Sequence, residues 1–173
     1  SIGGIGTISN RIVDIAAANA RNVAKSTAKG PSIVRLFIGT YTKKMDHVDG
    51  RGSGIYTAEF DTATGQFVGE ATLAAQCANP SFLCLGKGSQ QRHLYAVSEV
   101  TQTDSFGECG EVLAFQITEN FAGLTPLGKC ASLGLDPCYC ETDKAGMRLA
   151  VPNYSSGSLT VIQLRPDGSF GGK

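Results

Sequence analysis

Six cysteines and two histidines are the residues of this 173-residue chain whose types most readily do chemistry. Cys138 and Cys140 alternate with Tyr139 and would share one face of a strand, but a zinc site needs CxxC-type pairs or nearby histidines. Neither His47 nor His93 has ligand spacing to a cysteine, so we expect no metal site. An even cysteine count permits a disulfide framework, but cysteines in strand-like, apolar segments favour buried thiols in a reducing compartment.

Other catalytic patterns are absent from the sequence. It contains no Ser-His-Asp set, no phosphate-cradling Gly loop and no dinucleotide motif, so no cofactor is expected. Arg92 and Arg148 could bind a phosphate, but each precedes an apolar strand and is expected to be a solvated strand end. His93, at a strand start, is expected at the surface. His47 lies in the polar insertion 46–50 and is expected to be solvated.

The composition is that of a globular chain without a strong charge. Its 15 basic and 15 acidic side chains give a formal net charge of zero, which argues against nucleic acid as a partner. Apolar residues make up 42% of the chain, enough for a core, but no apolar run approaches the roughly 18 residues of a membrane span. The 22 glycines indicate many tight turns and therefore many short strands.

The N-terminal segment differs from the rest of the chain. Residues 1–34 carry four basic and one acidic side chain, whereas residues 35–173 carry 11 and 14, so we place a boundary near Gly30-Pro31. An amphipathic helix is predicted over 10–26, capped by Asn10. It resembles an organellar transit peptide, but a helical extension packed on the domain and a membrane-surface helix remain open. We expect a cytoplasmic protein, with an organellar location as the alternative.

After residue 34 the chain repeats itself. The strand-like run 36–41 recurs at 94–99 and 149–154, offset by 58 and then 55 residues. A second pair, 79–83 and 136–140, is offset by 57 residues. Repeats of about 40–60 residues with several short strands are typical of a β-propeller, because one blade cannot bury both of its faces whereas blades stacked around an axis can.

We therefore predict an all-β fold, a β-propeller of four-stranded antiparallel blades, with about two and a half blades present and a short N-terminal α-helix. The complete blade is expected to contain strands at 80–85, 93–98, 110–117 and 124–132. The flanking units are expected to contain strands at 35–42, 54–60, 66–73, 137–142, 148–154 and 157–164. A β-sandwich is the alternative fold. Because propellers need four to eight blades to close, we expect the chain to be too short to close by itself.

Several motifs along residues 36–173 occur in a fixed order. They are Ile38-Gly39-Thr40-Tyr41-Thr42, Gly54-Ile55-Tyr56, Asp61-Thr62-Ala63-Thr64-Gly65, Asn79-Pro80-Ser81-Phe82-Leu83, Leu94-Tyr95-Ala96-Val97-Ser98-Glu99, Pro137-Cys138-Tyr139 and Pro152-Asn153-Tyr154-Ser155-Ser156-Gly157-Ser158. Together they resemble the lactonase family of seven-bladed β-propellers, which includes bacterial-type 6-phosphogluconolactonases. The resemblance covers most of this chain but only the first part of a family domain. Tyr139 stands where such sequences usually carry His, and Pro152 replaces Ala in a strand.

The resemblance implies hydrolysis of a sugar lactone such as 6-phosphogluconolactone at the mouth of the propeller channel. This reaction needs an activated water and stabilisation of the carbonyl oxygen. The resemblance makes Glu99 the candidate catalytic base. It places the substrate-binding candidates at Tyr41, Asn79, Tyr139, Asn153 and Tyr154.

Two other functions remain open. A truncated propeller could be a non-catalytic structural or interaction subunit, and the family also includes muconate-lactonising cycloisomerases. Tyr139 in place of His favours the non-catalytic subunit for this chain alone. We expect that the remaining blades or other protein subunits are needed as partners, and that the isolated 173-residue chain does not hydrolyse 6-phosphogluconolactone above background.

Overall fold

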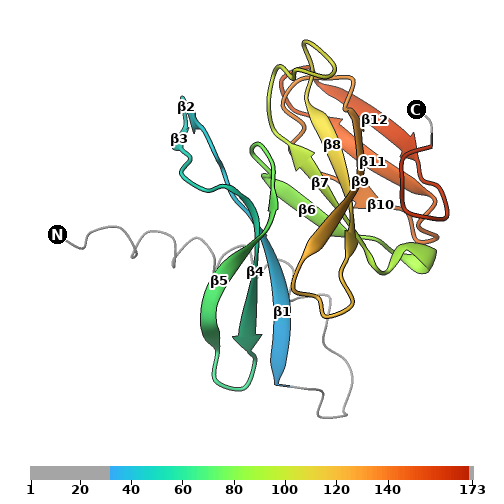
Figure 1. The fold of residues 1–173 in the computed structure, drawn as a ribbon. Coiled ribbons are helices and arrows are strands. Elements are labelled where there is room, and N and C mark those ends of the chain that lie inside the picture. The colour runs from blue at the N-terminus through green and yellow to red at the C-terminus, as the bar shows by residue number, and fades with distance from the viewer. Residues whose placement is uncertain (1–31, 172–173) are drawn as a thin grey trace.

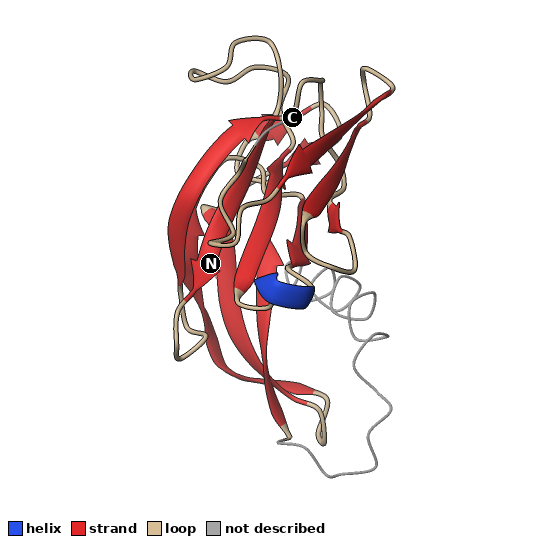
Figure 2. Ribbon diagram, turned by 90° about the vertical axis from the view of Figure 1, so that its right-hand side faces the viewer, coloured by secondary structure: helices blue, strands red, loops and turns tan. Residues whose placement is uncertain are grey.

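The computed structural model describes residues 32–171, which are built almost wholly of β-strands (Figure 1). The helix predicted over 10–26 lies outside the described residues. The elements are β1 (Ile33–Gly39), β2 (Lys44–Met45), β3 (Val48–Asp49), β4 (Gly54–Asp61), β5 (Gln66–Gln76), β6 (Phe82–Leu85), the 3₁₀ helix η1 (Gly88–Gln90), β7 (His93–Ser98), β8 (Glu111–Ile117), β9 (Leu124–Ala131), β10 (Glu141–Thr142), β11 (Arg148–Asn153) and β12 (Ser158–Gln163). Within residues 32–171, η1 is the only helix, drawn in blue in Figure 2.

Apart from the two-stranded β2–β3 hairpin, the strands of residues 32–171 form three successive antiparallel sheets, as the repeat predicts. The first blade has the order β1-β4-β5, the middle blade β6-β7-β8-β9 and the third blade β10-β11-β12. Pairing is local and antiparallel throughout these sheets, and the three blades lie in chain order across the molecule (Figure 1). The all-β propeller prediction is confirmed in this arrangement.

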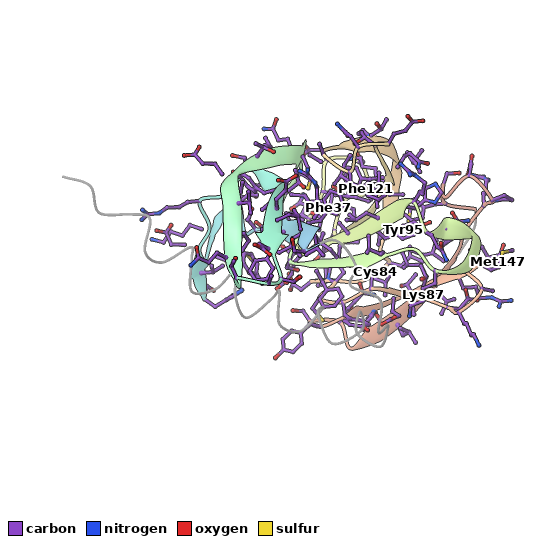
Figure 3. All side chains as sticks on the ribbon, turned by 90° about the horizontal axis from the view of Figure 1, so that it is seen from below. Phe37, Cys84, Lys87, Tyr95, Phe121 and Met147 are labelled. Atoms are coloured by element: carbon purple, nitrogen blue, oxygen red, sulfur yellow. The ribbon has the colours of Figure 1, made fainter. Side chains whose placement is uncertain are left out.

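The core consists of two layers, one on each face of the middle blade. Strand β7 separates them, because its side chains alternate between the two faces. Leu94 and Ala96 pack with Ile55 of the first blade, whereas Tyr95 and Val97 pack against residues of the third blade. Figure 3 shows the Tyr95 side chain within the dense packing between the sheets. This placement explains why residues 94–97 form a continuous apolar run rather than an alternating pattern.

Two predicted features differ from the structure. The expected strand 137–142 is reduced to the two-residue β10 and an isolated bridge between Pro137 and Asn153. The reason is local: Asp136 has a left-handed backbone with φ +52°, and a proline follows it without an N–H to donate. In addition, the polar insertion after Tyr41 forms a small hairpin, β2–β3, which extends away from β1 (Figure 1).

The prediction that His93 lies at the surface is wrong. Only 6% of His93 is exposed, because the turn around Gly168 covers its ring, and a Cβ at Gly168 would lie 2.3 Å from His93 Cδ2. The cysteines were expected to be buried, and this is true of three of the six. Cys109, Cys130 and Cys140 are buried, and the other three are half-buried. Over residues 32–171, no helix has the length and apolar character needed to cross a membrane.

Candidate functional site

One open cleft, of about 830 Å³, collects a side chain from each of the three blades. These side chains are Tyr41, Glu99 and Tyr154, each of which follows a strand: β1, β7 and β11 respectively. They occupy the same position in the sequence repeat, five residues after Leu36, Leu94 and Leu149. The repeat therefore brings three of the predicted site residues to one place.

Tyr41 and Glu99 form the central contact of the cleft. The Tyr41 hydroxyl donates a hydrogen bond of 3.0 Å to Oε2 of Glu99, which joins the first blade to the middle blade. Burial and, next, the negative charge of Glu99 raise the pKa of Tyr41 to about 12. The phenol therefore keeps its proton near neutrality and orients the carboxylate by donating to one of its oxygens. The other oxygen, Oε1, accepts no hydrogen bond from the described residues and is available to a water or a ligand.

Asn79 lies behind this pair and does not line the cleft. Its Oδ1 accepts hydrogen bonds from the backbone N–H of Thr42 at 3.0 Å and of Lys43 at 3.3 Å, and its Nδ2 donates to the backbone oxygen of Glu99 at 3.1 Å. The backbone N–H of Glu99 in turn donates to the backbone oxygen of Asn79 at 3.0 Å. Only 2% of Asn79 is exposed. The side-chain amide of Asn79 thus connects the backbones of the first and middle blades through hydrogen bonds.

The third blade repeats this scaffold with Asp136. Asn79 and Asp136 both have left-handed backbones, with φ of +40° and +52°, a conformation that Asn and Asp tolerate better than most residues. Both precede a proline, and the Tyr154 N–H donates to the Asp136 oxygen at 2.9 Å, as the Glu99 N–H does to Asn79. The carboxylate of Asp136 lines the cleft. The sequence analysis did not include Asp136 among the site residues. Its offset of 57 residues from Asn79 could have indicated that the two positions are equivalent.

Tyr139 and Asn153 do not line the cleft. The Tyr139 hydroxyl donates to Glu141, which raises the pKa of Tyr139 to about 12, and its ring packs on Phe82 with the centroids 4.4 Å apart. Asn153 is buried and donates to the backbone oxygen of Ser132 at 3.2 Å. Both side chains therefore serve the packing of the third blade in this structure.

His47 lines the cleft, which the sequence did not reveal. It lies at the turn of the β2–β3 hairpin, exposed as expected, but its ring meets the Tyr41 ring edge-on, with centroids 5.7 Å apart and planes at 85°. The only sequence signal was its position six residues after Tyr41, in a segment without strand periodicity.

The cleft has an acidic and hydroxyl-rich lining in the part of the chain that the structure describes. Its charged side chains are Asp46, Glu99 and Asp136, and no lysine or arginine lines it there. Arg92 lies elsewhere, 4.9 Å above the Phe121 ring, and Arg148 lies 3.8 Å from Asp143. Among the described residues, no cluster of His, Cys, Asp or Glu is arranged to hold a metal ion. The cleft can therefore accept protons and bind hydroxyl groups.

Comparisons with known proteins place this architecture in a family. Residues 35–173 match the family model described as "Lactonase, 7-bladed beta-propeller". The chain is 32% identical over 134 residues to the 6-phosphogluconolactonase of Bacillus subtilis (strain 168), covering 78% of this chain and 34% of that protein.

Two solved structures are similar to the chain at the level of the fold. A protein from Bacteroides fragilis NCTC 9343 is 31% identical with a TM-score of 0.66, over 86% of this chain and 36% of that one. The periplasmic gluconolactonase of Pseudomonas aeruginosa is 29% identical with a TM-score of 0.65, over 81% of this chain and 37% of that one. The chain thus spans about a third of the length of these relatives. On its repeat, its blades and the match over residues 35–173, the chain belongs to the lactonase family of seven-bladed β-propellers.

Proposed function

We propose that the cleft is part of a site for hydrolysis of a sugar lactone and that Glu99 is its general base. The observation that carries the proposal is the hydrogen bond from the Tyr41 hydroxyl to Oε2 of Glu99, which orients the carboxylate at the junction of two blades. A carboxylate fixed in this way can accept a proton from a water as that water attacks the lactone carbonyl. Tyr154 and Asp136, from the third blade, would contact the hydroxyl groups of the sugar.

The substrate is a sugar lactone of the kind named in the relatives. The relative from Bacillus subtilis is called a 6-phosphogluconolactonase and the one from Pseudomonas aeruginosa a gluconolactonase, so 6-phosphogluconolactone and gluconolactone are the two substrates to compare. Because the chain spans about a third of these relatives, the stabilisation of the carbonyl oxygen would come from blades beyond the three described. The 173-residue chain alone is expected to hydrolyse neither lactone above background.

Substitution of Glu99 tests the proposal. The full polypeptide that contains this sequence should hydrolyse at least one of the two lactones, measured by proton release in weak buffer, and Glu99→Gln should lower kcat by about 10²-fold or more. Tyr41→Phe is the companion variant: it keeps the carboxylate but removes the hydroxyl that orients it, so a smaller loss is expected. Wild-type turnover that persists unchanged in Glu99→Gln would reject Glu99 as the base.

The exposed apolar side chains of the outer strands support a second candidate, an interaction role for this chain by itself. Leu159 and Val161 of β12 are 63% and 46% exposed, and Phe67 and Val68 of β5 are also exposed. Such side chains favour contact with another protein surface. The interaction role would be favoured over the catalytic role if the chain binds a partner protein through these side chains and the resulting complex hydrolyses no lactone above background.

A further inference from the structure

Hydrolysis of a lactone needs a proton donor as well as a base. When water adds to the carbonyl, the base takes one proton, and when the ring C–O bond breaks, the departing alkoxide needs another. Asp46, Glu99 and Asp136 contribute carboxylate oxygens to the lining of the cleft, and such oxygens are acceptors. The Tyr41 hydroxyl already donates to Glu99, and its pKa of about 12 makes it a weak acid at neutral pH. The protonated Glu99 can return its proton, and a second side chain that donates to the leaving oxygen would separate this transfer from the one that Glu99 makes.

His47 is placed to be that donor. Of the described residues that line the cleft, it is the one that carries an imidazole, the group most often used in general acid–base catalysis. Its ring meets the Tyr41 ring edge-on, with 5.7 Å between the centroids, while Glu99 accepts a hydrogen bond from the Tyr41 hydroxyl. The imidazole and the carboxylate thus both contact Tyr41, and all three side chains line the cleft.

The backbone that carries His47 is tied to the backbone that carries Glu99. Lys44 pairs with Asp49 and Met45 with Val48, so the hairpin is regular up to the turn that contains His47. Asn79 Oδ1 receives the N–H groups of the two residues that precede the hairpin, and Asn79 Nδ2 also lies 3.2 Å from the Met45 sulfur. The same Nδ2 donates to the backbone oxygen of Glu99. One buried amide therefore connects the base of the hairpin to the backbone of Glu99.

We propose that His47 is the general acid of the site, in partnership with Glu99 as the base; the inference rests on the proposed lactone hydrolysis. Glu99 accepts a proton from the attacking water while the water oxygen bonds to the carbonyl carbon. The bond between that carbon and the ring oxygen then breaks, and the imidazolium of His47 transfers its proton to the leaving oxygen. The product is the hydroxy acid. Glu99 returns its proton and His47 regains one by exchange with solvent, so one water is consumed and no other reagent is needed.

The pH–rate profile of the full polypeptide tests this role. A base and an acid together give a bell-shaped profile of kcat/KM, in which loss of the acid's proton causes the alkaline limb. His47→Gln should lower kcat by about 10²-fold, change KM little and remove the alkaline limb. His47→Ala should regain turnover when free imidazole is added, because imidazole can deliver the missing proton. Asp49→Asn is the control, since Asp49 lies on the same hairpin, pairs with Arg51 and does not line the cleft.

The outcomes separate the two proposals. If Glu99→Gln abolishes turnover while His47→Gln keeps both the rate and the alkaline limb, the base stands and the role of His47 is rejected. An Asp49→Asn variant as impaired as His47→Gln would show that the hairpin acts through its fold alone, which also rejects the acid. If the full polypeptide hydrolyses neither lactone, the proposed function fails and the role of His47 fails with it.

Discussion

The middle blade and the blades that flank it contain similar strands but bury them differently. In β7 every residue is buried, because the first blade covers one face and the third blade covers the other. In β12 only one face is covered, so burial alternates along the strand: Thr160 and Ile162 are buried, whereas Leu159 and Val161 are exposed. The difference shows that the stability of a blade depends on its neighbours and not only on its own strand pairing.

The contrast between covered and open blade faces predicts the largest effect on stability at Tyr95. Its side chain is fully buried, and its hydroxyl donates to the Gly168 oxygen at 3.0 Å. Tyr95→Ala should therefore lower the free energy of unfolding by about 3–5 kcal/mol, because it leaves a cavity between two blades. Leu159→Ala, the matched change on the open face, should cost less than about 1 kcal/mol. Urea unfolding of both variants measures the difference, and equal losses would contradict the contrast between covered and open faces.

A smaller effect is expected on association of the chain with itself. Each large apolar side chain that leaves water gains about 1.5–3 kcal/mol, so the open faces of the outer blades should pair between copies at micromolar concentration. Replacement of Leu159 and Val161 by lysine should raise the dissociation constant at least about tenfold, which sedimentation velocity can measure. A wild-type chain that sediments as one monomeric species and unfolds reversibly would contradict this expectation.

The smallest effect concerns Tyr41, at the junction of the first and middle blades. Its pKa is raised from 10.0 to about 12 in the folded chain, so the unfolded chain loses the phenolic proton first as the pH rises. The stabilisation from this group is present in full below pH 10 and is lost as the pH rises toward 12. Phenolate absorbance should show this ionisation at about pH 12 in the wild type and at lower pH in Glu99→Gln. An unchanged titration in that variant would mean that Glu99 has no influence on Tyr41.

The sequence predicted those features that depend on local patterns. Strand β7 was predicted at its observed bounds, because a short apolar run between turn residues leaves little choice of ends. The hairpin β2–β3 was missed, since strands of two residues have no periodicity to detect. The burial of His93 depends on a turn about 75 residues away in the chain, a contact that no local pattern encodes.

The residues of the candidate site were also predicted only in part. The family resemblance predicted Tyr41, Glu99 and Tyr154 at the mouth of the channel, and the structure brings all three to one cleft. The sequence could not show whether the amide of Asn79 meets a ligand or the backbone, because both uses need the same donors and acceptors. In the structure, the Asn79 amide is occupied by backbone groups of two blades. His47 was missed because it belongs to the hairpin and has no counterpart in the repeat.

The equivalence of Tyr41, Glu99 and Tyr154 has an evolutionary consequence. The backbone at this position lies within two residues of the end of a paired strand and, in the second and third blades, its N–H donates to the backbone oxygen of the residue before the proline. These backbone restraints do not depend on the side chain, so the three equivalent positions hold a phenol, a carboxylate and a second phenol. Duplication of a blade would copy this position, and a single point mutation could then change its side chain without altering the backbone around it. A site built from such equivalent positions could therefore change one residue at a time without a change of fold.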